Sequence, residues 1–450
     1  MKQTWLSVSI SAALFVAATP AWSAVGLLDV YRMAASHDAK LSQARAEYKA
    51  NQELVSIARS PLLPQVTASA SYAKNDSSFD SGDVDNRNMA LNVQQALYHH
   101  DSWAKYSQAK YNLKKAEYTL KSAEQDVIVR VADAYFKVLL AQEDVKLAKA
   151  KEKADKTQWD RAEASAEVGL ASKTDVLQAK SSYDLSKSDR ISAENNLDVA
   201  YEELMKLTGT PVHSLKEIAL NVRLPKQVLN IGKFETEAQQ NNLTVLQTEE
   251  QVNAASKEVE VQKSGHWLSV DLKASYSDTA YYNYKNDAYS SLRYNDSNDL
   301  NVGVYASLPL YSGGGTSSRV AQARANYQAA TAGLRDAQET ARLNARIQVR
   351  NVERGIELVE ANRAAVKSND AFLEAAEEGY KVGLKDLLEV LTARTNKFQA
   401  RRNLASSLHN VVLSRLKLDA AVGDLNVDKL QAFDALLSDP TSQPMPSVEP

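Results

Sequence analysis

Hydrophobic residues recur every three or four positions along two very long segments of the chain, residues 102–168 and 317–380. In the first segment, Val127, Val131 and Ala134 follow this spacing, and no proline or glycine interrupts it. Such a period places the hydrophobic side chains on one stripe of an α-helix. At 1.5 Å per residue this helix would be about 100 Å long, too long for one compact domain to enclose. We therefore predict two helical rods that pack lengthwise against other helices.

The same periodicity predicts four shorter helices. Pro61 and Pro64 end the first of them, because two prolines cannot continue a helix. Two short helices together match the length of one rod, so we expect them to stack end to end beside it as antiparallel coiled-coil partners. The predicted segments are residues 27–59, 176–207, 234–264, and a last helix that follows Gly383 and ends at Ala421.

Four short segments between the helices alternate hydrophobic and polar residues, which is typical of β-strands with two different faces. They are residues 66–72, 89–98, 270–276 and 300–308. Strands that are apolar on one face and polar on the other suit a membrane β-barrel, although a soluble β-sandwich edge would show the same pattern. Four strands are too few to close a barrel, and an open edge is not viable in lipid. We therefore expect several protomers to contribute strands to one barrel.

The order of elements occurs twice along the chain. The sequence Val-Gly-Leu at 168–170 matches Val-Gly-Leu at 382–384, and the helix ends at 207–209 and 421–423 correspond in the same way. Both pairs are separated by 214 positions (382 minus 168, and 421 minus 207). A constant offset is the signature of a structural repeat. We expect a first repeat at residues 25–230, which ends in an irregular connector from about residue 211, and a second repeat at residues 231–437.

The two ends of the chain differ from the repeats. Residues 1–24 combine Lys2, a mostly apolar core and a small-residue end, which predicts a cleaved secretory signal. No later apolar run reaches the length of about 18 residues that a transmembrane helix needs. Residues 438–450 contain four prolines, so we predict a disordered C-terminal tail.

Composition removes several classes of chemistry. The 450-residue chain has a formal charge of -3 and no cysteine, which excludes disulfides, thiolate sites and a lipidated N-terminal cysteine. Basic and acidic residues are interleaved, so no nucleic-acid partner is expected. The glycine-rich segment 312–316 has no lysine at the phosphate-loop spacing, and His99 and His100 are adjacent rather than at ligand spacing. We expect neither an enzyme nor a cofactor or metal site.

Over essentially the whole mature chain, the sequence resembles the TolC family of outer-membrane channel-tunnels. The stretches that carry the resemblance are residues 58–65, the two Val-Gly-Leu turns and residues 379–383. The TolC subgroup is the closest, since lipoprotein relatives begin with a cysteine that is absent here. The resemblance implies a homotrimer, with a 12-stranded transmembrane β-barrel of four strands per protomer on a long α-helical tunnel through the Gram-negative periplasm. It also implies an exit duct for tripartite multidrug efflux pumps or type I protein secretion.

In this family, the periplasmic helix tips close the tunnel by hydrogen bonds and ion pairs between helix pairs. The resemblance implies closing contacts of Thr174 and Asp175, at the first turn, with Tyr380 and Lys385, at the second. The family often has arginine in place of Lys385. Lysine cannot make the planar bidentate contact of arginine, so a weaker latch is expected.

The family also lines the constriction with acidic rings. Of two acidic positions, this chain retains Glu389, and the other is Thr392. The resemblance thus implies a single ring of three carboxylates in a trimer, which argues against strong cation binding. Asp175 and Glu389 could instead be ordinary solvated charges of a coiled coil.

The two Val-Gly-Leu turns resemble the tips that meet the adaptor's helical hairpin. An exposed Val and Leu beside a Gly form a small apolar knob that a coiled-coil groove could accept, although a plain helix–loop–helix turn has the same residues. The implied partners are a periplasmic membrane-fusion adaptor, an inner-membrane RND, MFS or ABC transporter, and outer-membrane lipid. The tip residues are Val168, Gly169, Leu170, Val382, Gly383 and Leu384.

The residues leave a second class of function open, a non-transporting structural or adhesive coiled-coil protein of the cell envelope. The alternating strands argue against it, because such a protein has no need of a lipid-facing strand surface. The helical rods argue against a substrate-selective porin, because a porin lacks them.

Overall fold

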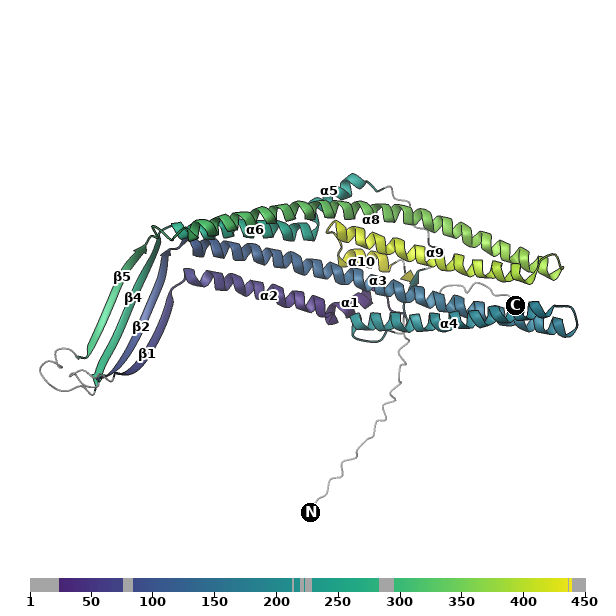
Figure 1. Cartoon of the computed structure of the whole chain (residues 1–450), viewed down its shortest axis with the longest axis horizontal. Coiled ribbons are helices and arrows are strands. Elements are labelled where there is room, and N and C mark those ends of the chain that lie inside the picture. The colour runs from purple at the N-terminus through teal and green to yellow at the C-terminus, as the bar shows by residue number, and fades with distance from the viewer. Residues whose placement is uncertain are drawn as a thin grey trace, which may run out of the picture.

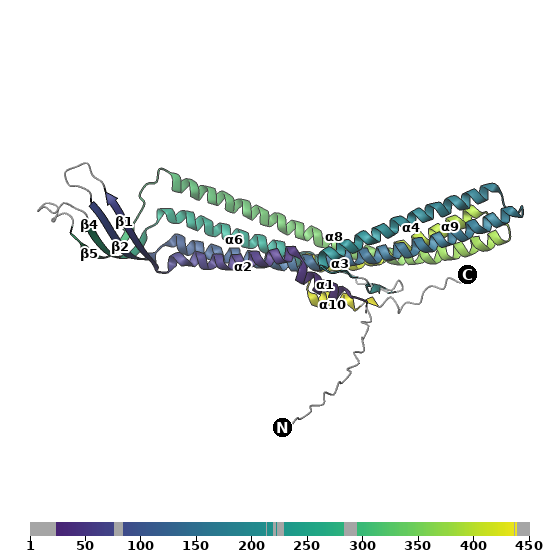
Figure 2. The same cartoon turned by 90° about the horizontal axis from the view of Figure 1, so that it is seen from below.

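The computed structural model describes residues 24–75, 84–212, 214–218, 222, 229–282, 295–435 and 437–438. Apart from Ala24 and Ser438, the predicted signal and tail lie outside these residues. The protein is elongated. A sheet lies at one end, and the turns that connect one long helix to the next lie at the opposite end in both views (Figures 1 and 2). No helix in the described part of the chain has the length and apolar character needed to cross a membrane.

The two predicted rods are continuous helices. Their ends lie within two residues of the expected positions, because the apolar stripe continues without a proline from one end to the other. Val127, Val131 and Val138 on the first rod are fully buried, so the stripe faces the core as predicted. The rods are α3 (His100–Glu167) and α8 (Gly315–Lys381).

The predicted helices at 27–59 and 234–264 were wrong in one respect, since each is two helices separated by a single residue. The carboxylate of Asp38 accepts a hydrogen bond from the Leu41 amide at 2.8 Å, and the Asn242 side chain accepts one from the Thr244 amide at 2.9 Å. Asp and Asn stabilise a helix start in this way, so each begins a new helix. The pairs are α1 (Leu27–His37) with α2 (Ala39–Arg59), and α5 (Ile231–Asn241) with α6 (Leu243–Lys263).

Short helices lie beside the rods as predicted. Along α3, the helices α1 and α2 pack beside one half, and α4 (Lys173–Thr208) packs beside the other. Along α8, the same arrangement is made by α5 and α6 on one side and α9 (Leu387–Ala421) on the other. The first repeat is joined to the second by contacts of α6 and of α9 with α3. We call α3 with α4 the first hairpin, and α8 with α9 the second hairpin.

The four predicted strands form one antiparallel sheet of order β1-β2-β4-β5. The register places Ala68, Leu91, Tyr276 and Leu300 in one row across all four strands. Leu91, Tyr276 and Leu300 are 46%, 47% and 73% exposed, so the sheet presents an apolar face to its surroundings. The strands are β1 (Gln65–Asn75), β2 (Val84–Tyr98), β4 (Ser269–Tyr282) and β5 (Ser297–Ser307). The 3-10 turns Ser60–Leu62 and Ser264–His266 lead from helix to sheet.

The middle of the molecule holds elements that were not predicted. The helix α10 (Val427–Asp434) packs on α1, and β3 (Glu217–Ile218) pairs with β6 (Leu437–Ser438). The described part of the predicted irregular connector therefore includes a strand. Beside it, the buried Tyr135 hydroxyl donates a hydrogen bond to the Lys216 carbonyl oxygen at 2.8 Å. Leu430 of α10 and Ile218 of β3 belong to the largest core cluster of the described residues, in which both hairpins meet.

Candidate functional site at the helical tips

Both hairpins reverse direction through the same tight turn. Gly169 and Gly383 have φ values of +77° and +75°, a left-handed conformation that glycine adopts without strain. The amides of Leu170 and Leu384 donate to the carbonyl oxygens five residues earlier, each at 2.8 Å. This is the Schellman arrangement that ends a helix. The glycine in each predicted Val-Gly-Leu turn is thus needed by the backbone.

The apolar residues of the two turns are turned outward. Val168 and Leu170 are 69% and 84% exposed, and Val382 and Leu384 are 68% and 81% exposed. Both turns lie at the end of the molecule opposite the sheet (Figure 1). Large apolar side chains that the described residues leave exposed, gathered at one end, are typical of surfaces on which partners dock.

In the first turn, Asp175 is occupied by its own helix start. Its carboxylate accepts hydrogen bonds from the Ser172 amide at 3.0 Å and from the Ser172 hydroxyl at 2.8 Å. These bonds lower the pKa of Asp175. The amide of Asp175 donates back to the Ser172 hydroxyl, which completes a capping box at the start of α4. Thr174 is exposed beside it.

In the second turn, the charged residues are paired along α9. The Lys385 ammonium donates to a Glu389 carboxylate oxygen at 2.6 Å, four residues on. The Glu389 amide donates to the Asp386 carboxylate at 2.8 Å, which caps this helix. Thr392, the second ring position, is exposed, and its hydroxyl donates to the Leu388 carbonyl oxygen at 2.8 Å.

Tyr380 is the predicted gate residue that lies between the hairpins. It packs against a buried apolar cluster that joins Ala162 and Ala179 of the first hairpin to Leu387 of the second. It also packs on a cluster within the second hairpin that includes Leu373. Tyr380 therefore joins the hairpins by apolar contact.

Within the described part of one protomer, the predicted polar latch is not formed. Asp175 is bonded to Ser172 and Lys385 to Glu389, and neither Thr174 nor Asp175 makes a hydrogen bond or ion pair with the second turn. The polar contacts stay a prediction for the assembled protein, in which tips of neighbouring protomers would meet.

Sequence reasoning missed a buried charged contact close to the tips. Arg394 of α9 lies between Asp155 of α3 and Glu377 of α8. The signal was present in the helical spacing, since Arg394 lies three and seven residues after the buried Leu391 and Leu387. A charge on a buried stripe needs a partner, which periodicity alone does not identify.

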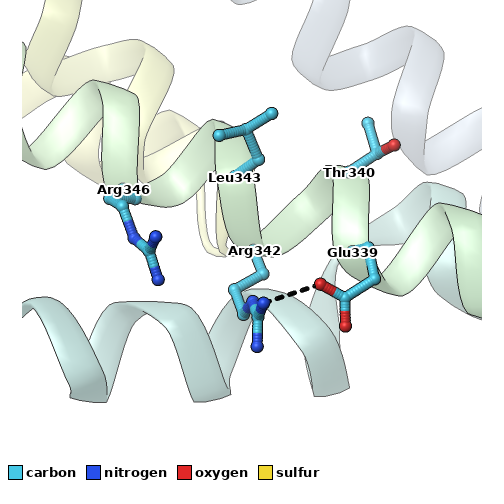
Figure 3. A pocket seen from close by; sticks show the side chains of 5 residues that line it. All are labelled: Glu339, Thr340, Arg342, Leu343 and Arg346. Atoms are coloured by element: carbon cyan, nitrogen blue, oxygen red, sulfur yellow. Dashed lines mark ion pairs between the residues drawn. The ribbon is translucent and has the colours of Figure 1, made fainter.

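A second charged place lies on the middle of α8 (Figure 3). Glu339, Arg342 and Arg346 line a shallow hollow of about 280 Å³, and the two arginines point toward the neighbouring helix. Arg342 pairs with Glu339 at 2.8 Å, and Arg346 donates to Glu235 of α5 at 2.5 Å. Both arginines are therefore paired, Arg342 within α8 and Arg346 across to α5, so we assign no ligand to this hollow.

The chain is similar to known proteins along most of its length. Residues 30–210 and 236–424 match the family described as "Outer membrane efflux protein". The chain is 32% identical over 435 residues to the outer membrane protein TolC of Vibrio cholerae, covering 96% of this chain and 98% of that protein. It is 31% identical to TolC of Escherichia coli, covering 95% and 88%. The proteases secretion protein PrtF of Dickeya chrysanthemi is 28% identical, covering 92% and 91%.

Solved structures show the same architecture. The Campylobacter jejuni CmeC outer membrane channel superposes with a TM-score of 0.78 at 17% identity, covering 97% of this chain and 98% of that chain. The outer membrane protein VceC of Vibrio cholerae gives 0.76 at 20% identity, covering 88% and 96%. These likenesses confirm the predicted combination of a four-stranded sheet with long helical rods. The chain belongs to the outer membrane efflux protein family.

Proposed function

We propose that three copies of this outer-membrane protein form an exit duct for multidrug efflux and type I protein secretion. The observation that carries the proposal is the placement of two exposed apolar surfaces at opposite ends of the rods. The face with Leu91 and Leu300 suits lipid, and the tips with Leu170 and Leu384 suit a protein partner. The helices between them are long enough to reach deep into the periplasm.

The sheet itself supports the trimer. Among the described strands, β1 and β5 each pair on one side only. An open edge in lipid leaves backbone amides and carbonyls without partners, which costs several kcal/mol for each group. Three sheets joined edge to edge would give 12 strands and leave no edge. The homotrimer is therefore part of the proposal.

Partners would act at the tips. We assign the six residues of the two Val-Gly-Leu turns to contact with a periplasmic adaptor, which couples the duct to an inner-membrane RND, MFS or ABC transporter. The relative named for protease secretion and the family named for efflux support both kinds of export. Glu389 would form one ring of three carboxylates at the constriction, with the hydroxyl of Thr392 near it in place of a second ring.

The function is tested in a strain that lacks the gene. Loss of the protein should increase sensitivity to dyes and detergents and stop export of type I substrates, and the cloned gene should restore both. The purified protein should run as a trimer without heating and form channels in planar bilayers. A water-soluble monomer that forms no channels would instead support the structural or adhesive alternative.

Tyr380→Phe combined with Lys385→Ser is expected to raise single-channel conductance. The double variant removes a hydroxyl and a charge from the tips, which weakens the latch proposed between protomers. Lys381→Ser is the matched control, since Lys381 is an exposed lysine of the same turn that pairs with Glu378 of its own helix. Equal conductance of the double variant and the parent would contradict the assignment of Tyr380 and Lys385 to the gate.

A further inference from the structure

The first and second hairpins are joined along a seam between α3 and α9. Phe136 stacks on His409 near the middle of the molecule, with ring centroids 5.3 Å apart. Farther along α3, Asp144 pairs with Arg402, and farther still Asp155 pairs with Arg394. Numbers rise on α3 as they fall on α9, so these contacts form successive rungs of one antiparallel seam. The apolar cluster around Tyr380 completes it near the tips.

The rung at Arg394 connects three helices. One Nη atom lies 3.7 Å from a carboxylate oxygen of Asp155, and the other donates to Glu377 at 3.0 Å. The Arg394 side chain is 12% exposed and that of Asp155 is 4% exposed. The contact with Glu377 stays within the second hairpin, whereas the contact with Asp155 crosses to the first. Separation of the hairpins here must break the contact with Asp155.

Burial makes this contact sensitive to the loss of one partner. Desolvation raises the pKa of Asp155, and the positive charges of Arg394 and Lys151 oppose that rise. Arg394 is the more buried of these two cations, since the Lys151 side chain is 22% exposed. The Nη1 atom that faces Asp155 has no hydrogen-bond partner in the described structure. At 3.7 Å the contact is an ion pair rather than a hydrogen bond.

The neighbouring rung provides a contrast. Arg402 and Asp144 join the same two helices through two hydrogen bonds of 2.7 Å and 3.1 Å. Their side chains are 46% and 24% exposed, so water can replace either partner. Exposed pairs contribute little to stability, whereas removal of one member of a buried pair leaves the other charge buried without a partner.

We propose that Arg394 is a positioning residue of the gate, which holds the first and second hairpins together through Asp155 and so favours the closed duct. This inference rests on the function proposed above. It assigns the control of opening to a contact inside one protomer, in addition to contacts between protomers at the turns. Opening the duct separates Asp155 from Arg394 and gives both charges access to water.

Two variants of the buried rung and two of the exposed rung test the proposal. Arg394→Met and Asp155→Asn each remove the cross-hairpin ion pair with little change in side-chain size. Arg402→Met and Asp144→Asn make the same changes on the same helices at the exposed pair. Each purified trimer is placed in planar bilayers, and its open probability and conductance are recorded. Arg394→Lys, which keeps the positive charge, serves as the conservative rescue.

We expect Arg394→Met and Asp155→Asn to raise the open probability by about tenfold or more, because the buried pair is lost. The exposed-rung variants should stay within about twofold of the parent, and Arg394→Lys should lie nearer the parent than Arg394→Met. Equal effects at both rungs, or none at the buried rung, would overturn the proposal. If Arg394→Met fails to form trimers, Asp155→Asn decides the question. A parent that forms no channels would instead contradict the proposed function.

Discussion

Leu384→Asp is expected to abolish drug efflux while the trimer still forms. Leu384 is 81% exposed, so no core contact is lost and the folded protomer should be stable. At a docked tip the new carboxylate would be taken out of water into an apolar groove without a partner. Loss of one such anchor typically costs at least 2 kcal/mol, or about thirtyfold in affinity. Dye efflux from cells measures the effect, and unheated gel electrophoresis measures the trimer.

Controls separate charge from shape and from backbone conformation. Leu384→Met keeps an apolar side chain of similar size and should retain efflux. At the first turn, a Cβ atom on Gly169 would meet no atom of the described residues within 4 Å, so its φ of +77° is the main restriction on substitution. Asn and Asp are the residues other than glycine that adopt this conformation, so the pair differs mainly in charge and Gly169→Asn should export better than Gly169→Asp. Trimer loss in Leu384→Asp would mean that the turn is structural and not a docking surface.

Asp38→Asn is expected to destabilise the folded protomer more than a substitution at any exposed ion pair. Asp38 is 6% exposed and accepts two hydrogen bonds from Arg130, at 2.7 Å and 3.1 Å. Asparagine keeps the helix cap at this break but removes the charge, so the ion pair is tested alone. We expect the free energy of unfolding to fall by about 2–3 kcal/mol, since a buried pair is broken. Thermal unfolding of the purified protein measures this change.

Asp126→Asn is the matched control. Asp126 binds the same guanidinium at 2.6 Å but is 52% exposed and lies four residues before Arg130 on one helix. Such a pair contributes about 0.5 kcal/mol or less. If both variants unfolded at the same temperature, burial would not be the source of the stabilisation.

The same pair should make stability depend on pH. The hydrogen bonds from Arg130 lower the pKa of Asp38 in the folded protein. A lowered folded-state pKa adds stability above the unfolded value of about 3.9, and this is lost as pH falls through the folded-state value. The difference between the parent and Asp38→Asn should therefore be full at neutral pH and shrink in acid below about pH 4.

The rods, the short helices beside them and the four strands were predictable because the spacing of hydrophobic residues within each segment indicates its secondary structure. The breaks at Asp38 and Asn242 were missed because hydrophobic spacing continues across both positions. A capping side chain interrupts a helix without changing that spacing. The strands β3 and β6 are two residues each and exist only because residues more than 200 positions apart meet. No local pattern specifies such a pairing.

At the tips, too, some features were predictable from local sequence and others were not. Gly169 and Gly383 were identifiable because a break in a helical stripe at glycine is a local signal, and their left-handed backbone follows from it. The pairing of Asp155 with Arg394 joins the two repeats, so neither helix alone predicts it. Ser172 was also overlooked as the partner of Asp175, although serine three residues before an acid at a helix start is a local signature.

The register of the sheet has a consequence for the order in which the chain folds. The outer pairs, β1 with β2 and β4 with β5, are each formed by neighbouring segments of sequence. The central pair brings Leu91 to Tyr276 across most of one repeat. Closing so large a loop is slow, because its entropy is lost before the contacts are gained. The two strand pairs should therefore form first and meet only after α3, which follows β2, has aligned with α6, which precedes β4. The complete sheet should therefore be the last part to form.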